Sequence, residues 1–338
     1  MTMQDDCAPK REDTSGVMSG IVWPDRIPHL IHVGFPKTGS TWLQRWFEAN
    51  PQVLFRECGI GGYSSTLDIC RPVIDRSRVR CRVTSHEDLI TPTPKDIHGN
   101  IPRDEVGNAG GVAHDLIPQR QLEVCEELFQ LFPDAHVLIV TRGLESGLKS
   151  GFGEMVRSGL PLTSTEFFGD EERLRNMLRH GNYGRVVAMY RRMFGGRVLV
   201  LPYELLRDDP ERFRRAIEDF VGLPPCDWPA GKINASLEPF ELRWYPWIAK
   251  AIYRLPVLPR VRQALLRRHV RAIRSGRWKP FARALDRLSG RPAQPVEVPP
   301  GVCELMRGSA DVLLGDARYA PYRDDYLPGS RASDAGLN

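Results

Sequence analysis

The chain has 338 residues, of which 41% are hydrophobic and 26% charged, with a formal net charge of +5. That length and composition predict a folded domain of substantial size with a buried core, and no apolar run reaches the roughly 18 residues that a membrane-spanning helix needs. Seven cysteines without a close pair and eight dispersed histidines exclude a disulfide framework, and we expect no metal site.

The two ends of the chain have the composition of disordered segments. Residues 1–26 mix acids, bases, serine and glycine and contain no apolar stretch of the kind found in a signal peptide. We therefore expect a disordered lead-in over 1–26, a disordered tail over 329–338 and a cytoplasmic location.

Strands and helices alternate along the next two hundred residues. The apolar run at 30–33 predicts a strand, a Gly/Pro-punctuated turn follows, and apolar residues at helical spacing predict a helix from Ser40. Residues 80–84 could form a second strand, and 91–114 lack any period and predict a long loop. Further on, helices are predicted at 118–132, 144–157, 170–179, 183–194 and 208–221, with buried strands at 136–141 and 197–201. This alternation predicts an α/β fold over 27–240, with a central parallel sheet flanked by helices.

The character changes in the last hundred residues, where we expect a basic helical extension over 241–328 packed on the same domain. Between Arg243 and Arg291 the chain carries fourteen Lys or Arg and one acid, Asp286. The aromatic and basic mixture is consistent with docking on an anionic membrane, peripherally at its inner surface, or with capture of an acidic glycan. A helical subdomain with core aromatics and a solvated basic face is an equal alternative. Nucleic acid is disfavoured, because no recognised binding module is present.

The segment from Gly34 to Thr41 has the frame G-x-x-x-x-G-S-T of a phosphate-binding loop. A strand that enters a helix through such a turn directs backbone N–H groups and the positive helix end at one point, where an anion binds. Ser40 occupies the position of the lysine in an NTP-binding loop, and the cation comes earlier, at Lys37. A plain strand–helix turn with a solvated lysine is the alternative. Trp42 could belong to the core or stack on a base.

Three segments resemble the sulfotransferases that use 3′-phosphoadenosine 5′-phosphosulfate (PAPS). The first is the loop Pro36, Lys37, Thr38, Gly39, Ser40, Thr41, Trp42 and Leu43, which matches the family's P-K-[ST]-G-[ST]-T-W-L throughout. The second is the strand 137–141 followed by Arg142 and, eight residues later, Ser150. The third is a strand followed by Tyr203-Glu204-Leu205-Leu206, then Asp209-Pro210 and a helix ending in Phe220-Val221-Gly222-Leu223.

The resemblance implies a role for each of these segments. The 36–42 loop would bind the 5′-phosphosulfate, Arg142 and Ser150 the 3′-phosphate, and Tyr203 would lie near the adenine. Lys232 to Ser236 is similar to an Asn-x-Ser segment of bacterial and carbohydrate members, so Ser236 would close over the nucleotide. The chain departs from the family in having Gly143-Leu144 where Asn-Pro usually follows the arginine.

The reaction implied by the resemblance is transfer of a sulfuryl group from PAPS to a hydroxyl or amine of a carbohydrate, glycolipid or small molecule. Lys37 would neutralise charge on the leaving phosphate, with no metal ion required. Two residues compete as the general base that takes the acceptor's proton, His86 after a predicted strand and Glu57 after the first helix.

Two other functions compete with sulfuryl transfer. A P-loop nucleoside kinase or NTPase is opposed by Ser40 in place of the loop lysine and by Thr141 and Arg142 where a Mg²⁺-binding aspartate belongs. A catalytically degenerate, membrane-associated nucleotide-binding protein is opposed by the joint presence of Lys37, Arg142 and Ser150.

Overall fold

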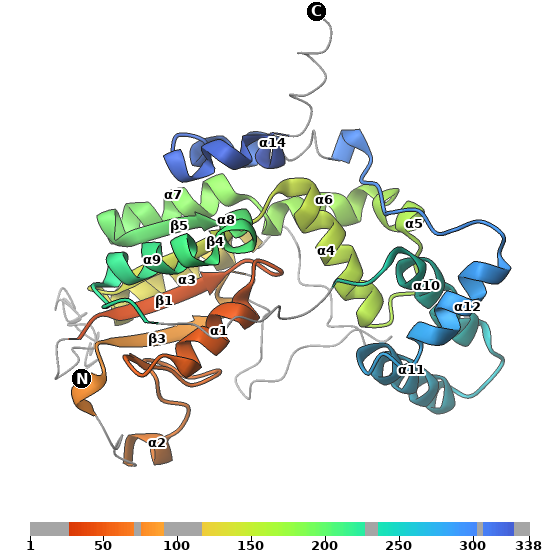
Figure 1. Ribbon diagram of the computed structural model, residues 1–338, viewed down its shortest axis with the longest axis horizontal. Helices are drawn as coiled ribbons and strands as arrows, with labels where there is room; N and C mark the ends of the chain where they lie inside the picture. The colour runs from red at the N-terminus through yellow and green to blue at the C-terminus, as the bar shows by residue number, and fades with distance from the viewer. Residues whose placement is uncertain (1–26, 71–75, 91–116, 227–235, 303–306, 328–338) are drawn as a thin grey trace, which may run out of the picture.

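The computed structural model describes residues 27–70, 76–90, 117–226, 236–302 and 307–327 (Figure 1). The predicted lead-in at 1–26, the predicted loop at 91–114, residues 232–235 and the tail at 329–338 lie outside these ranges.

A five-stranded parallel sheet forms the centre of the molecule. Its order is β2-β3-β1-β4-β5, and every neighbouring pair is parallel. The strands are β1 (His29–Gly34), β2 (Val53–Leu54), β3 (Cys81–His86), β4 (His136–Thr141) and β5 (Val198–Pro202). The apolar runs are continuous because helices cover both faces of the sheet, which is the usual setting of parallel strands. The predicted α/β class is confirmed.

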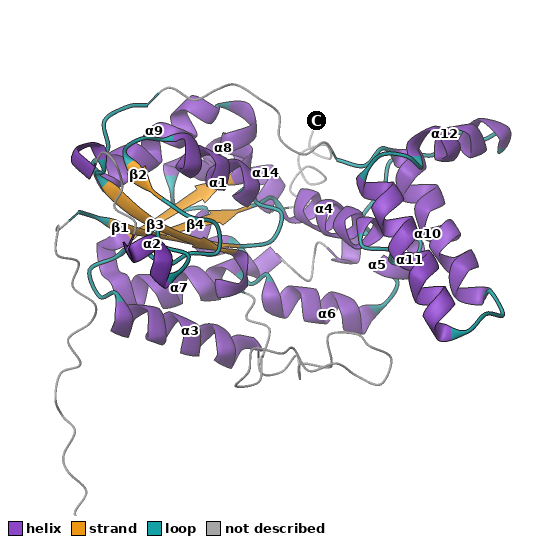
Figure 2. Cartoon of the chain, turned by 90° about the horizontal axis from the view of Figure 1, so that it is seen from below, coloured by secondary structure: helices purple, strands orange, loops and turns teal. Residues whose placement is uncertain are grey.

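Each face of the sheet packs on its own set of helices (Figure 2). Alternate residues of β1 and β4 point to opposite faces, so Leu30 and Leu138 belong to one core and Ile31 and Val137 to the other. The first core is covered by α1 (Ser40–Ala49), α8 (Tyr203–Asp208) and α9 (Pro210–Val221), and the second by α3 (Ile117–Leu131) and α7 (Tyr183–Phe194).

The strand order places a crevice at the carboxyl end of β1. From β1 the chain moves toward β2 and β3, and it then crosses back to add β4 on the other side of β1. Ligands of open α/β sheets bind where the winding direction reverses in this way. The turn after β1 and the turn after β4, which leads into α4 (Leu144–Arg157), therefore meet at one place.

Three basic helices follow the α/β part; the first two pack against α4, and the third packs on the first (Figures 1 and 2). They are α10 (Pro239–Arg254), α11 (Pro259–Arg274) and α12 (Lys279–Leu288). Tyr245, Ile273 and Ala282 bury their side chains in the same core as β1 and α7. The helical extension is thus present, and its aromatic Tyr245 is a core residue. None of the helices in the described ranges is both long and apolar enough to cross a membrane.

Shorter elements complete the described chain, and most of them carry no periodic sequence signal. They are α2 (Thr66–Cys70), α5 (Ser164–Phe168), α6 (Glu171–His180), α14 (Arg323–Tyr326) and the 3₁₀ turns Arg76–Arg78, Glu87–Leu89, Gly195–Arg197, Arg307–Ser309, Asp311–Leu313 and Ala317–Tyr322. The helix predicted from 208 begins at Pro210, because Asp209 is its N-cap and accepts a hydrogen bond from the amide of Arg212. Tyr203 opens α8 directly after β5.

Candidate active site

The loop after β1 has the backbone shape of an anion cradle. Lys37 and Gly39 both adopt left-handed conformations, with φ of 66° and 93°. Helix α1 then starts at Ser40, with the amides of Trp42 and Leu43 donating to the carbonyl of Gly39. The amides before Trp42 have no carbonyl one turn earlier to bind, so the positive end of α1 is available to an anion.

Gly39 is required both by its backbone angle and by its neighbours. A Cβ built on it would lie 2.7 Å from Cδ2 of Leu206 and 3.3 Å from the ring of Tyr203. The loop therefore rests directly on α8, which fixes its distance from Tyr203.

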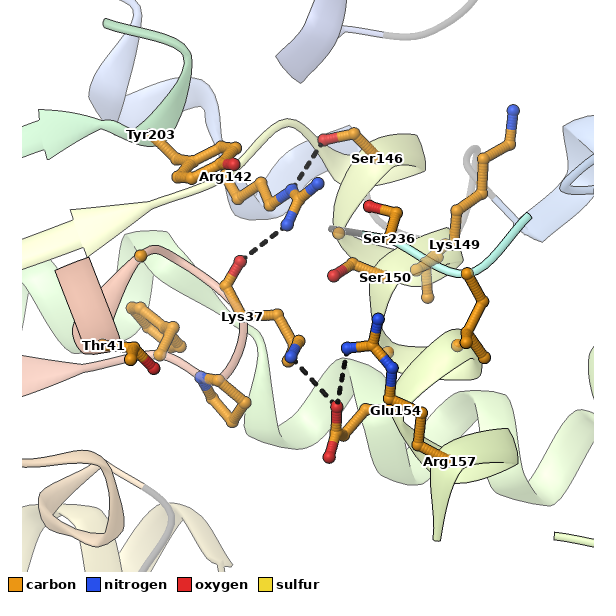
Figure 3. Close-up of a pocket in the computed structure, with 18 of the residues that line it drawn as sticks. Lys37, Thr41, Arg142, Ser146, Lys149, Ser150, Glu154, Arg157, Tyr203 and Ser236 are labelled. Carbon is orange, nitrogen blue, oxygen red and sulfur yellow. Dashed lines mark hydrogen bonds and ion pairs between the residues drawn. The ribbon is translucent and has the colours of Figure 1, made fainter. Parts of the chain in front are cut away.

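The side chain of Lys37 reaches across to helix α4 (Figure 3). Its Nζ donates to Oε2 of Glu154 over 3.1 Å, and Arg157 approaches the same oxygen at 3.7 Å. The Lys37 and Glu154 side chains retain 30% and 40% of their exposure, so solvent screens the pair and a ligand can compete for the lysine.

Arg142 connects the turn after β4 to the turn after β1. Its Nη1 donates to the carbonyl of Lys37 over 2.7 Å, and its Nε donates to the Ser146 hydroxyl over 3.1 Å. The guanidinium also lies over the ring of Tyr203, 4.4 Å from the ring centre. Arginine is suited to this position because its planar fork can stack and donate in several directions at once.

One face of α4 presents polar side chains to the crevice. Ser146, Ser150 and Glu154 succeed each other at four-residue spacing and line the cleft, while Phe152 and Val156 are buried and do not line it. Figure 3 shows Ser150 facing the space between Arg142 and Arg157.

The remaining residues of the loop divide between structural and cleft-lining positions. The buried Thr38 hydroxyl donates to the carbonyl of Phe35 over 2.6 Å and so stabilises the turn. The Ser40 hydroxyl is buried without a hydrogen-bond partner among the described residues, whereas Thr41 is exposed at the cleft. Pro36 also lines the cleft. The Trp42 ring packs on Phe213 and also lines the cleft, and its stacking on a base stays a prediction.

A buried network behind the crevice holds the turn that carries Arg142. Glu204, fully buried, accepts hydrogen bonds from the amide of Gly143 at 2.9 Å and from the hydroxyl of Tyr326 at 3.0 Å. Tyr183 donates to the carbonyl of Arg142, and burial raises the pKa of Tyr183, which keeps its hydroxyl protonated as a donor. The C-terminal helix α14 is therefore part of the support of the site.

The packing of α14 also explains why glycine, at position 143, follows Arg142 in place of the asparagine of the Asn-Pro pattern. A Cβ on Gly143 would lie 2.7 Å from Cβ of Asp325 in α14. Because real side chains do not approach that closely, the residue after Arg142 must be glycine wherever α14 is packed in this position.

These elements enclose a cleft of about 2170 Å³ between the sheet edge and the helical extension. Tyr203 and Arg214 line it on the α/β side, and Leu242, Arg274 and Lys279 line it from α10, α11 and the start of α12. Ligand pockets are usually about 300–1,000 Å³. The cleft is therefore large enough to hold two substrates together.

The structure brings most, but not all, of the sequence-predicted site residues together. Lys37, Arg142, Ser150, Tyr203 and Ser236 all line the cleft with the loop. His86 ends β3 beside Val33, and Glu57 is exposed after β2, and neither is among the cleft-lining residues of the described ranges. The neighbouring Glu87 does line the cleft. The identity of the base stays a prediction.

Glu154 and Ser146 are not indicated by the sequence analysis, and Glu204 appears there only within the 203–206 segment, without a role of its own. For the first two a signal exists, because they stand one helical turn to either side of Ser150 and share its face. The contacts of Glu204 have no such signal, since its partners Gly143 and Tyr326 lie far away in the chain.

The described residues contain no group of three or more His, Cys, Asp or Glu side chains arranged to hold a metal ion. The acidic residues at this site are used otherwise, Glu154 with Lys37 and Glu204 with the Gly143 amide.

Comparison with known proteins relates one segment of the chain to a known family. Residues 120–229 match the model of the sulfotransferase family, a range that includes Arg142, Ser150 and Tyr203 but not the Lys37 loop. No curated protein matches the chain. Among solved structures, a sulfotransferase from Alicyclobacillus acidocaldarius is similar at 20% identity, covering 66% of this chain and 91% of that one with a TM-score of 0.40, a likeness too weak to add to the assignment. The matched range is about a third of the chain, and over that range the chain is similar to the sulfotransferase family.

Proposed function

We propose that the protein transfers a sulfuryl group from PAPS to a hydroxyl, or an amine, of a carbohydrate, glycolipid or small-molecule acceptor. The observation that carries the proposal is the junction of Lys37 and Arg142. These two cations come from the turns after β1 and β4, and a 2.7 Å hydrogen bond from the guanidinium to the Lys37 carbonyl ties them together. A donor with phosphate groups at two ends needs two such anion sites at a fixed separation.

The residues of the cleft fit such a donor. The amides at the start of α1, the unpartnered Ser40 hydroxyl and the Lys37 ammonium would bind the 5′-phosphosulfate. Arg142 and Ser150 would bind the 3′-phosphate, and the Tyr203 ring, already stacked on Arg142, would lie against the adenine. Ser236 would contribute from the segment that leads into α10.

In the reaction, the acceptor oxygen forms a bond to sulfur while the bond from sulfur to the 5′-phosphate oxygen breaks. The acceptor's proton passes to a general base, and negative charge grows on the leaving phosphate. Lys37 and the helix amides stabilise that charge, which is the main contribution a protein makes to a transfer of this kind.

The base is predicted to be His86 or Glu57, and we add Glu87 because it lines the cleft. Replacing the true base by an isosteric neutral residue is expected to lower kcat by about 10²-fold or more. Each of the three is replaced singly, His86→Gln, Glu57→Gln and Glu87→Gln, and donor affinity is measured in parallel to separate loss of chemistry from loss of binding.

The direct test is transfer of labelled sulfate from PAPS to a panel of glycan, glycolipid and phenol acceptors. The proposal predicts a labelled product with at least one acceptor class, and strongly reduced transfer by Lys37→Ala. Failure of every class to accept label, with the donor bound, would confine the protein to nucleotide binding without catalysis.

A further inference from the structure

The turn between α10 and α11 exposes an unusual number of apolar side chains. Tyr253, Leu255, Leu258 and Val261 are 46%, 40%, 74% and 45% exposed, and all lie within nine residues. We call these four residues the α10–α11 tip. Scattered apolar residues are normal on a protein surface, whereas a concentration at one protruding point indicates a contact with another surface.

The turn is rigid, so the apolar side chains are held outward. Pro256 and Pro259 restrict the backbone, and the amide of Val257 donates to the carbonyl of Leu255 over 2.9 Å. Arg262 reaches back and donates to the same carbonyl over 3.2 Å. The conformation of the turn therefore holds Leu258 in its exposed position.

Positive charge surrounds the tip. Arg254 and Arg260 flank it directly, and neither forms an ion pair with any residue that the structure describes. No acidic residue occurs between Arg243 and Asp286. Trp247, one to two turns back on α10, is half-exposed, and Lys250 lies 5.2 Å from the centre of its indole while forming an ion pair with Glu166.

We propose that the α10–α11 tip docks the protein on an anionic lipid bilayer. The leucines and Val261 enter the boundary between headgroups and acyl chains, and the arginines bind lipid phosphates. An acidic polysaccharide would form ion pairs with the arginines but would leave the leucines in contact with water. A second copy of this chain would bring like charges together. The combination of apolar tip and unpaired arginines therefore favours the membrane.

The two helices connect this surface to the catalytic cleft. Glu241 and Leu242 at the start of α10 and Ile273 and Arg274 at the end of α11 line the cleft, and the tip lies at the opposite end of both helices. Sixteen residues of α-helix span about 24 Å. Docking at the tip therefore holds the cleft near the membrane without covering it.

Co-sedimentation of the full chain with vesicles tests the proposal. Vesicles of phosphatidylcholine alone are compared with vesicles that also contain phosphatidylserine, at low and at high salt. The protein is expected to sediment with the anionic vesicles, and the bound fraction is expected to fall as salt screens the arginines.

Variants separate the two contributions. Leu255→Ser with Leu258→Ser is expected to weaken binding by about tenfold or more, since two large apolar side chains no longer leave water. Arg254→Gln with Arg260→Gln is expected to remove most of the salt dependence. Leu122→Ser is the matched control, an exposed leucine of similar exposure on α3, and is expected to bind as the parent does.

All of these positions are on the surface and outside the cleft, so nucleotide affinity is expected to be unchanged in every variant, which also shows that the fold is intact. Absence of binding to anionic vesicles at low salt would overturn the proposal. Equal binding by the double-leucine variant, or binding to a heparin-like polysaccharide with none to vesicles, would also overturn it.

Discussion

The ion pair between Lys37 and Glu154 makes a quantitative prediction about donor affinity. The lysine Nζ lies 3.1 Å from the carboxylate, and a phosphate that binds the lysine must displace or share that contact. The substitution Glu154→Gln removes the competing charge, keeps the size of the side chain and eliminates a negative group beside an anionic ligand.

The expected size of the effect follows from the exposure of the pair. With 30% and 40% of the two side chains exposed, and Arg157 sharing the carboxylate, the pair contributes less than about 1 kcal/mol. Loss of the competing contact and of the like-charge repulsion together should tighten binding of 3′-phosphoadenosine 5′-phosphate by about two- to tenfold, at 1.4 kcal/mol per factor of ten. The gain should shrink at high salt.

Calorimetric titration at two salt concentrations measures this change. The matched control is Glu171→Gln, which alters charge equally and breaks the 2.7 Å pair with Arg175, with neither residue among those that line the cleft. The control should change affinity by less than about twofold. Weaker binding by Glu154→Gln would refute the reasoning, because it would make Glu154 a partner of the ligand rather than its competitor.

Three further predictions concern Arg142, the neighbouring Gly143 and the buried His32 of β1. Arg142→Lys should lower bisphosphate affinity by roughly 10- to 100-fold in the same titration, since lysine cannot both stack on Tyr203 and donate in two directions. Gly143→Ala should lower the free energy of unfolding by about 1–3 kcal/mol in thermal or urea denaturation, whereas Gly196→Ala, with no atom near its Cβ, should be close to neutral. Burial lowers the pKa of His32 to about 4, so the unfolded chain gains a proton below pH 6.5 that the folded chain excludes. The contribution of His32 to the free energy of unfolding should thus be constant above about pH 6.5 and fall by up to ~3 kcal/mol as the pH drops toward 4. His32→Gln should remove this part of the slope in urea titrations and leave the part due to His29, whose pKa burial also lowers to about 4.

The parallel sheet could be predicted from the sequence because its strongest signals are local. The apolar runs of β4 and β5 and the Gly/Pro turn after β1 each lie within a few residues, and each corresponds to a strand or a turn in the structure. The two-residue strand β2 and the short α5 could not be predicted, since neither is long enough to show a period.

The site was predictable to the extent that its residues follow strands. Lys37, Arg142 and Tyr203 come directly after β1, β4 and β5, and parallel strands bring those ends together. Contacts across the fold gave no local signal. Glu204 with Tyr326, and Gly143 with Asp325, join residues more than a hundred positions apart, so only the folded chain shows why Gly143 replaces asparagine.

The candidate bases illustrate the same limit. His86 and Glu57 were chosen for their residue type and position after predicted elements, and these features do not determine which side of a loop faces a cleft. The structure places Glu87 at the cleft lining instead, one residue beyond His86.

The measurement that tests the central claim most directly is titration of the protein with 3′-phosphoadenosine 5′-phosphate, adenosine 5′-phosphate and ATP with Mg²⁺. A two-anion site formed by Lys37 and Arg142 predicts tightest binding of the bisphosphate, with that preference reduced in Arg142→Lys while binding of the monophosphate changes less. Preference for ATP with Mg²⁺, or equal affinity for the bisphosphate and the monophosphate, would contradict the account.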